Sequence, residues 1–363
     1  MSKRILVIGL GKVGSLVAHL LRDAGFDVTG LDCEARDDLP FRVATGDVAN
    51  PGTLAENIKG QDAVFSCLPY HLNKTLVEAA VAAGVHYFDL TEDVPTARHI
   101  QELSKNARCV LAPQCGLAPG FIAIVGASLA EKFDTLRSIR LRVGALPQSP
   151  HGMLGYAFNW SPEGVVNQYL NDCEVIQDGV RKTVPAMQNR ETLVIEGIKL
   201  EAFTTSGGLG TLCETFAGKV QDLNYMTIRY PGHLDLMRFY FHEILMKNNR
   251  KLAGEILVNA LPPVNNDIVY VYAAVNGWKT VSGRREHVLD EYVHAYLPKN
   301  LAGRNWRAIS WTTACSACAV VELVFSGEIL SHGFLRQEAI PFEKFLATKN
   351  GRHFAPHNQE INA

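Results

Sequence analysis

The sequence lacks a strong excess of charge of either sign. Its 363 residues include 35 Lys and Arg and 37 Asp and Glu, for a net charge of −2. A near-neutral chain without basic runs is poorly suited to bind nucleic acid or an anionic membrane surface. The longest apolar stretch that we identify, around residues 121–130, is well short of the ~20 residues that a membrane-spanning helix needs. We therefore expect neither a nucleic-acid partner nor a membrane.

The chain also lacks the cysteine density of a disulfide-stapled protein. Its eight cysteines are scattered, which is typical of free thiols in a reducing compartment. Cys315 and Cys318 form a CxxC pair, but no second pair completes a zinc site, so we expect helix packing and no metal. Near the N-terminus, Lys3 and Arg4 precede a short apolar run that ends at a glycine-rich turn without a small-residue cleavage site. This pattern predicts a buried first strand and a cytoplasmic protein.

The first 120 residues alternate short β-rich runs with helical patterns, which is the signature of a parallel sheet built from βαβ units. We predict an α/β fold class for this part, a doubly wound dinucleotide-binding domain over residues 1–120. Its expected strands cover residues 4–8, 28–31, 42–44, 63–67, 85–88 and 109–111.

The pattern changes after Gly120. Apolar and polar residues alternate over 139–143, which is typical of a strand with one wet face. Asp178-Gly179 and Asn276-Gly277 are hairpin signals, and residues 234–247 have a helical pattern. These features predict a second, α+β domain with a mainly antiparallel sheet.

We assign this substrate-binding and dimerisation domain to residues 121–308. Residues 309–348 are predicted to be a helical segment that returns to the first domain. Residues 349–363 form a polar tail that we expect to be mobile. Because exposed sheet surfaces of this size seek partners, a homodimer is also expected.

A glycine-rich motif lies between the first strand and the first helix. Gly9, Gly11 and Gly14 form GxGxxG, in which glycines permit a tight turn and backbone N–H groups approach a pyrophosphate at the helix N-terminus. Asp32 follows 18 residues after Gly14, where a carboxylate can accept hydrogen bonds from the adenine ribose. This Rossmann-type pattern predicts NAD as the cofactor, while Arg36 keeps NADP open.

Other predicted cofactor contacts follow the ends of later strands, because ligands of open α/β sheets bind outside the carboxyl ends of the strands. Asp47 is placed either against the adenine or in a solvated turn. With the glycine motif, the remaining predicted contacts are Lys12, Val13, Val48, Cys67, Leu68, Pro69, Asp89, Gly116 and Ala118.

Four further motifs, together with the glycine-rich opening, resemble the saccharopine dehydrogenase family. They are CGLAPG at 115–120, GYAFNWSPEG at 155–164, LEAFTTSGG at 200–208 and TIRYPGH at 227–233. The second motif is similar to glutamate-forming saccharopine reductases, whereas the last two are similar to bacterial lysine 6-dehydrogenases. The resemblance covers roughly residues 1–330, and the short chain favours the lysine 6-dehydrogenase type.

The resemblance implies an NAD(P)-dependent amino-acid dehydrogenase that oxidises a carbon–nitrogen bond of lysine or of a saccharopine-like amino acid, through an imine to a semialdehyde. Arg229 is the expected partner of the substrate carboxylate, because a guanidinium matches a carboxylate bidentately. The other expected substrate contacts are Tyr156, Trp160, Thr205, Ser206, Gly207 and Gly208.

Removal of hydride requires a neutral amine, so a general base is useful. Asp93, Glu163 and His233 are the candidates. Two alternatives stay open: a polyamine-pathway dehydrogenase that acts on carboxynorspermidine-like amines, and a non-catalytic NAD(P)-binding sensor.

Overall fold

The computed structural model describes residues 2–36 and 38–355. Its first sheet is parallel, with the strand order β17-β6-β5-β4-β1-β2-β3. The strands are β1 (Arg4–Ile8), β2 (Asp27–Asp32), β3 (Val43–Thr45), β4 (Ala63–Ser66), β5 (His86–Asp89), β6 (Val110–Ala112) and β17 (Gly333–Phe334).

Helices cover both faces of this sheet, because its strands are apolar on both sides. The helices are α1 (Gly14–Asp23), α2 (Pro51–Ile58), α3 (Tyr70–Ala83), α4 (Val94–Ser104) and α10 (Ala308–Ser326). Alternate β1 residues divide between two cores: Ile5 and Val7 pack with α1 and α10, whereas Leu6 and Ile8 pack with α2, α3 and α4. The predicted doubly wound domain is confirmed.

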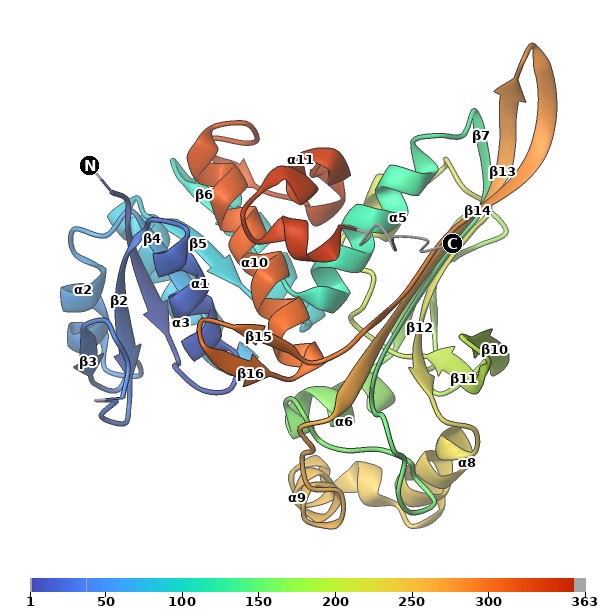
Figure 1. Cartoon of the computed structure of the whole chain (residues 1–363), viewed down its shortest axis with the longest axis horizontal. Helices are drawn as coiled ribbons and strands as arrows, with labels where there is room; N and C mark the ends of the chain where they lie inside the picture. Colours follow the sequence, from blue (N-terminus) through green and yellow to red (C-terminus); the bar gives the residue numbers. More distant parts are fainter. Residues whose placement is uncertain (1, 37, 356–363) are drawn as a thin grey trace, which may run out of the picture.

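The second sheet has the order β10-β11-β12-β7-β13-β14, and β8 pairs with β12 and β9. All its pairs are antiparallel except β7 with β12. The strands are β7 (Thr135–Pro147), β8 (Cys173–Gln177), β9 (Val180–Val184), β10 (Glu191–Ile195), β11 (Ile198–Thr204), β12 (Asp222–Arg229), β13 (Asp267–Val281) and β14 (Arg284–Tyr296). The predicted α+β domain is therefore confirmed, and Figure 1 shows the β13–β14 ribbon extending beyond the body of the molecule.

Helices α5 (Ile122–Ala130) and α10 lie between the two sheets (Figure 1). The remaining helices are α6 (Pro162–Leu170), α7 (Leu212–Thr215), α8 (His233–Arg238), α9 (Arg250–Ala260) and α11 (Phe342–Ala347), and β15 (Lys299–Leu301) pairs with β16 (Arg304–Trp306). By length and composition α10 is apolar enough to cross a membrane, but most of this helix is buried inside the protein. The expectation that residues 121–130 are the longest apolar stretch is thus wrong.

One of the two predicted hairpins is correct. Asp178 and Gly179 both have positive φ and join β8 to β9. The turn predicted at Asn276-Gly277 is wrong, because β13 runs through it and turns only at Ser282-Gly283, both with positive φ. Gly277 instead lies at a bulge, where a Cβ atom would be 2.2 Å from the Thr135 carbonyl oxygen.

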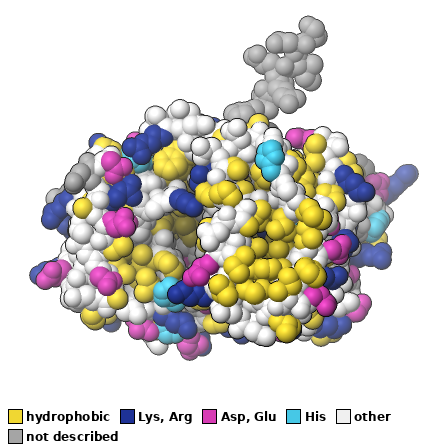
Figure 2. Space-filling model, turned by 90° about the horizontal axis from the view of Figure 1, so that it is seen from below, with side chains coloured by type: hydrophobic (Ala, Val, Ile, Leu, Met, Phe, Trp, Pro, Cys, Tyr) yellow, Lys and Arg dark blue, Asp and Glu magenta, His cyan; other side chains and the backbone are white. Residues whose placement is uncertain are grey.

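The single helix predicted over 234–247 is broken. Helix α8 ends at Arg238, a π-helical turn covers Phe239–Glu243, and Leu245 has φ +62°, which no helix interior accommodates. Exposed apolar side chains occur in this region and in α9, namely Phe239, Ile244, Leu245, Leu252 and Ile256. Figure 2 shows a broad apolar area on the underside of the molecule.

The C-terminal part packs on the first domain, as expected for α10, whose Cys318 Sγ lies 3.7 Å from the Val17 carbonyl oxygen. It is not purely helical, however, because β17 joins the first sheet beside β6. The prediction of a mobile polar tail is also wrong for residues 349–355, because Asn350 and Phe354 are buried. Residues 356–363 lie outside the described residues.

Candidate active site

A cavity of about 420 Å³ lies between the two domains, at the carboxyl ends of the parallel strands. One wall consists of the glycine loop and the segments that follow β4, β5 and β6. The other wall consists of β7, β12 and the segment that leads into α6. This is the position in which an open α/β sheet binds its ligand.

The glycine loop begins the first wall. Gly9 has φ +84°, and a Cβ atom on Gly14 would be 1.8 Å from the Gly9 carbonyl oxygen, so neither position accepts a side chain without a change of backbone. Gly11, Lys12, Val13 and Gly14 line the cavity. The loop leaves room for a pyrophosphate beside backbone N–H groups at the start of α1, so these residues fit a dinucleotide.

Asp32 ends β2 beside this loop. Its carboxylate accepts hydrogen bonds from the backbone N–H groups of Leu10, at 2.6 Å, and Glu34, at 3.1 Å. Burial alone would raise the pKa of Asp32, but these two bonds hold it below its ordinary value. Arg36 is engaged by Asp38 at 3.0 Å and by the Leu10 carbonyl oxygen. The Asp32 carboxylate is therefore charged where the adenine ribose is expected to bind, and the Arg36 guanidinium is already paired with Asp38.

Most of the other predicted cofactor contacts reach the cavity: Cys67, Leu68, Pro69, Gly116 and Ala118 line it. Asp47 and Val48 do not, and Asp47 accepts a bond from the Ala49 N–H at 2.8 Å in an exposed turn. Gly9 shapes the loop from behind.

Asp89 lies beneath the cavity and is fully buried. It accepts hydrogen bonds from the backbone N–H groups of Thr91 and Gln114, both at 2.9 Å, and from Tyr87 Oη at 2.8 Å. Burial raises the pKa of Asp89 to about 6. It ties together the segments that follow β5 and β6, so it positions the cofactor wall and does not form its surface.

Arg229 lies in the opposite wall, at the end of β12, and is 2% exposed. Its Nε donates to Tyr169 Oη at 2.8 Å and its Nη1 to the Ile228 carbonyl oxygen at 2.7 Å. The guanidinium carbon is 4.7 Å from the centre of the Tyr156 ring. No carboxylate pairs with Arg229 within residues 2–36 and 38–355. A buried cation without a counter-ion is suited to an anionic ligand.

His233 supports this arginine from outside the cavity. Its Nδ1 lies 2.9 Å from the Leu154 carbonyl oxygen, which can only accept, so Nδ1 donates and Nε2 accepts from Tyr169 Oη at 3.0 Å. Burial, helped by nearby Arg229, lowers the pKa of His233 to about 3. The imidazole is 1% exposed and neutral, so the geometry gives it a positioning role in place of the predicted catalytic one.

Of the two aromatic residues predicted to contact the substrate, one lines the cavity and the other does not. Trp160 lines the cavity, and its Nε1 donates to Tyr156 Oη at 3.1 Å. Tyr156 is 5% exposed and lies behind it, against Arg229.

The 205–208 segment lies behind the wall instead of forming it. Thr205 Oγ1 is buried and has no hydrogen-bond partner within the described ranges, and Ser206 Oγ donates to the Asp172 carbonyl oxygen at 2.9 Å. A Cβ atom on Gly208 would be 2.3 Å from the Tyr225 ring, and one on Gly207 would be 2.6 Å from the Glu92 carbonyl oxygen. None of these four residues lines the cavity, so their contact with the substrate stays a prediction. The two glycines allow Tyr225 and Glu92 to pack closely.

Of the predicted general bases, Glu163 alone lines the cavity. Asp93 caps α4, accepting from the Thr96 N–H at 2.9 Å and from Thr96 Oγ1 at 2.6 Å. The sequence analysis missed Glu92, which does line the cavity. Its position after the carboxyl end of β5 was the available signal, because ligands of open α/β sheets bind there.

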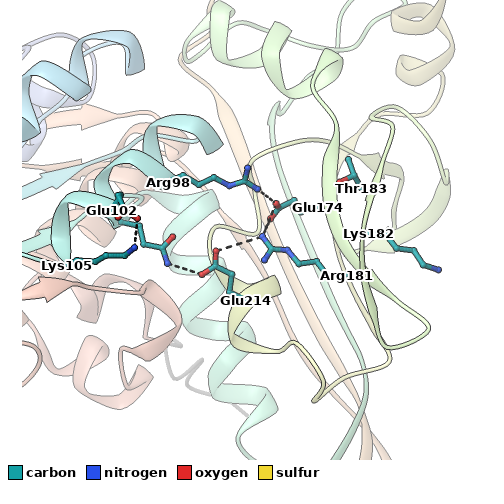
Figure 3. Close-up of a pocket in the computed structure, with 9 residues that line it drawn as sticks. Arg98, Glu102, Lys105, Glu174, Arg181, Lys182, Thr183 and Glu214 are labelled. Carbon is teal, nitrogen blue, oxygen red and sulfur yellow. Dashed lines mark hydrogen bonds and ion pairs between the residues drawn. The ribbon is translucent and has the colours of Figure 1, made fainter.

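A second, more open groove of about 750 Å³ lies elsewhere between the domains (Figure 3). Arg98 of α4 pairs with Glu174 of β8 at 2.5 Å, and Arg181 of β9 reaches Glu174 at 3.0 Å. Gln101 donates to Glu214 at 3.0 Å. Most of the charges in this groove pair with one another, and several of these pairs link the two domains. We therefore place the reaction site in the 420 Å³ cavity.

Comparison with known proteins agrees with this architecture. Residues 5–112 match the saccharopine dehydrogenase NADP binding domain, and residues 116–351 match the saccharopine dehydrogenase C-terminal domain. The structure of apo saccharopine dehydrogenase (L-Glu forming) from Saccharomyces cerevisiae has a TM-score of 0.72 at 15% identity and covers 93% of this chain and 94% of that one. The fold is therefore shared.

Two curated relatives match about half of this chain. Saccharopine dehydrogenase [NADP(+), L-glutamate-forming] of Pyricularia oryzae is 24% identical over 194 residues, 49% of this chain and 42% of that protein. The mitochondrial alpha-aminoadipic semialdehyde synthase of Bos taurus is 25% identical over 191 residues, 49% of this chain and 21% of that protein. The chain thus covers less than half of each relative. The two matched domains, in order and over most of the sequence, place the chain in the saccharopine dehydrogenase family, with a nicotinamide dinucleotide as its cofactor.

Proposed function

We propose that the protein is an NAD(P)-dependent oxidoreductase that oxidises a carbon–nitrogen bond of a lysine-type amino acid. The observation that carries this proposal is Arg229, a buried guanidinium without a carboxylate partner in the described chain, in the cavity that also holds the glycine loop. An amino-acid carboxylate would complete its pairing across the cavity from the cofactor loop.

The oxidised nicotinamide supplies the hydride acceptor when it is bound. The residues of this chain do the rest: the glycine loop and Asp32 hold the dinucleotide, and Arg229 fixes the substrate carboxylate. Tyr169 and His233 hold the guanidinium in place through the hydrogen bonds described above. Water then hydrolyses the imine, which releases a semialdehyde and ammonia when the substrate is lysine.

The charges that line the cavity favour lysine over saccharopine. Four charged residues contribute, namely Lys12, Glu92, Glu163 and Arg229. Lys12 belongs to the cofactor loop, so one cation and two carboxylates remain for the substrate. That set suits a molecule with one carboxylate and two amines, whereas saccharopine brings three carboxylates. Saccharopine is our second candidate, because the relative from Pyricularia oryzae is named for it.

We further propose that NAD is preferred to NADP. The charged Asp32 would repel a 2′-phosphate, and Arg36 is held by Asp38. A cytoplasmic location and a homodimer also remain predictions. Light scattering in solution would test the dimer.

The test is the rate of nicotinamide reduction, followed by absorbance, with L-lysine and saccharopine separately, each with NAD and with NADP. We expect turnover of lysine with NAD. Turnover of saccharopine alone would reverse the substrate assignment, and turnover of carboxynorspermidine alone would favour the polyamine pathway. Cofactor binding without turnover of any amine would contradict the proposal and favour a sensor.

A further inference from the structure

The segment after β5 carries three carboxylates with different surroundings. Asp89 accepts two backbone N–H bonds and one phenol bond, and Asp93 caps α4. Both carboxylates therefore form hydrogen bonds that stabilise the fold. Glu92, between them, has no hydrogen-bond partner in the described chain other than its own backbone N–H, and no cation pairs with it there. It is the carboxylate of this segment that lines the cavity.

Two glycines from the second domain make room for Glu92. A Cβ atom on Gly207 would be 2.6 Å from the Glu92 carbonyl oxygen and 3.3 Å from its Cβ. A Cβ atom on Gly164, in the first turn of α6, would be 2.5 Å from Glu92 Oε1 and 2.6 Å from the Trp160 ring. The carboxyl group is therefore held between the domains, beside Trp160, where a larger residue at either glycine would displace it.

The charged side chains that act most strongly on Glu92 are acidic. Burial raises the pKa of Glu92 to about 7, and Asp93, Asp89 and Glu163 act in the same direction. A carboxylate in this environment attracts a cation and accepts a proton more readily than an exposed one.

We propose that Glu92 accepts the proton of the substrate's reacting ammonium group, an inference that rests on the proposed function. The nitrogen–hydrogen bond breaks, the proton moves to a carboxylate oxygen of Glu92, and the electron pair stays on nitrogen. That pair then forms the carbon–nitrogen double bond as the adjoining carbon gives up hydride to the oxidised nicotinamide. Glu92 ends the step protonated and returns its proton to water.

The test is the pH dependence of kcat/KM for L-lysine in Glu92→Gln, which preserves shape but cannot take a proton. We expect kcat to fall about 10²–10⁴-fold, the range for loss of a general base. The wild type is expected to have an acidic limb near pH ~7, and this limb is expected to disappear in Glu92→Gln. The matched control is Glu102→Gln, the same change on the exposed face of α4, which should keep both the rate and the limb.

A binding measurement separates proton transfer from misfolding. With reduced cofactor present, the wild type should bind L-lysine more tightly than L-norleucine, which lacks the side-chain amine. Glu92→Gln should lose on the order of tenfold of that preference, about 1.4 kcal/mol, while its cofactor affinity is unchanged.

An active wild type whose acidic limb survives in Glu92→Gln would overturn this inference alone. Loss of the limb in Glu163→Gln instead would transfer the role to Glu163. A wild type that turns over no amine would overturn the proposed function and this inference together.

Discussion

Two arginines on neighbouring strands of the second sheet are almost completely buried, yet among the residues that the structure describes only one of them has an acidic partner. Arg142 on β7 is 1% exposed; it pairs with both oxygens of Glu191 and donates to the carbonyl oxygens of Leu141 and Asn224. Arg229 on β12 is 2% exposed and is surrounded by tyrosines. Since Arg142 is in register with Met226, alternation along β12 places the two arginines on opposite faces.

The difference in pairing indicates that Arg142 has a structural role and that Arg229 binds a ligand. Burial of a charge is costly unless it is paired and hydrogen-bonded. Glu191 supplies the acidic partner of Arg142, so this ion pair holds β7 to the start of β10. The face with Arg229 leaves the pairing incomplete at the cavity, so we infer that its carboxylate comes from the substrate.

The largest effect should follow from Arg229→Met. Removal of one partner of a buried, hydrogen-bonded charge pair costs ~2–5 kcal/mol, so kcat/KM for lysine should fall on the order of a thousandfold. The midpoint of thermal unfolding should stay the same or rise, because an uncompensated buried charge is removed. Steady-state kinetics and calorimetry measure both; a variant that loses stability and keeps kcat/KM would reverse the roles of the two arginines.

Arg142→Met should give the opposite result. Glu191 loses its partner, and because its side chain is 29% exposed, we expect the free energy of unfolding to fall by about 1–3 kcal/mol. The value of kcat/KM should stay within about threefold of the wild type. Denaturant unfolding and steady-state rates test this pair of expectations.

A half-buried carboxylate without a cationic partner in the described chain, such as Glu92, should show its cost in the pH dependence of stability. The pKa of Glu92 is about 7 when folded, above its ordinary value, so the folded state holds its proton more tightly than the unfolded state. The wild type therefore loses stability as the pH rises towards ~7, and Glu92→Gln should not. We expect the variant to have the higher unfolding midpoint above pH ~7 and no advantage below pH ~4. Calorimetry across this range measures it; an equal advantage at every pH would contradict the assignment.

The smallest effect should come from His233→Gln. His233 contacts Tyr169 and does not line the cavity, so loss of the imidazole should loosen Arg229. We expect KM for lysine to rise by about 3–10-fold, the effect of losing one hydrogen bond worth ~0.5–1.5 kcal/mol. The pH profile of kcat should not move, because burial holds the pKa of His233 at about 3. A lost pH limb in this variant would restore its predicted catalytic role.

The sequence predicts the parallel sheet and the glycine loop because these depend on local patterns: apolar runs, helical spacing and glycines. It fails where tertiary contact decides between similar local signals. Asp178-Gly179 makes a turn and Asn276-Gly277 a bulge, although the two dipeptides have the same turn chemistry. The two-residue strand β17 is too short to have a periodic signal.

The candidate site shows the same limit. Arg229 was identified from its motif, and the structure places it in the cavity wall. Asp93 and Glu92 are adjacent acids, and only the contacts with Thr96 and with the second domain decide that Asp93 caps a helix while Glu92 lines the cavity. The 205–208 segment has hydroxyls and glycines suited to binding, but the packing of Tyr225 and Glu92 places it behind the wall.

The most direct test of the claim for Arg229 is calorimetric binding of L-lysine and of cadaverine, which lacks the carboxylate, in the presence of reduced cofactor. The wild type should prefer lysine by at least about tenfold, or ~1.4 kcal/mol, and Arg229→Met should bind the two compounds equally. An undiminished preference for lysine in Arg229→Met would show that the carboxylate is bound elsewhere and would contradict the account.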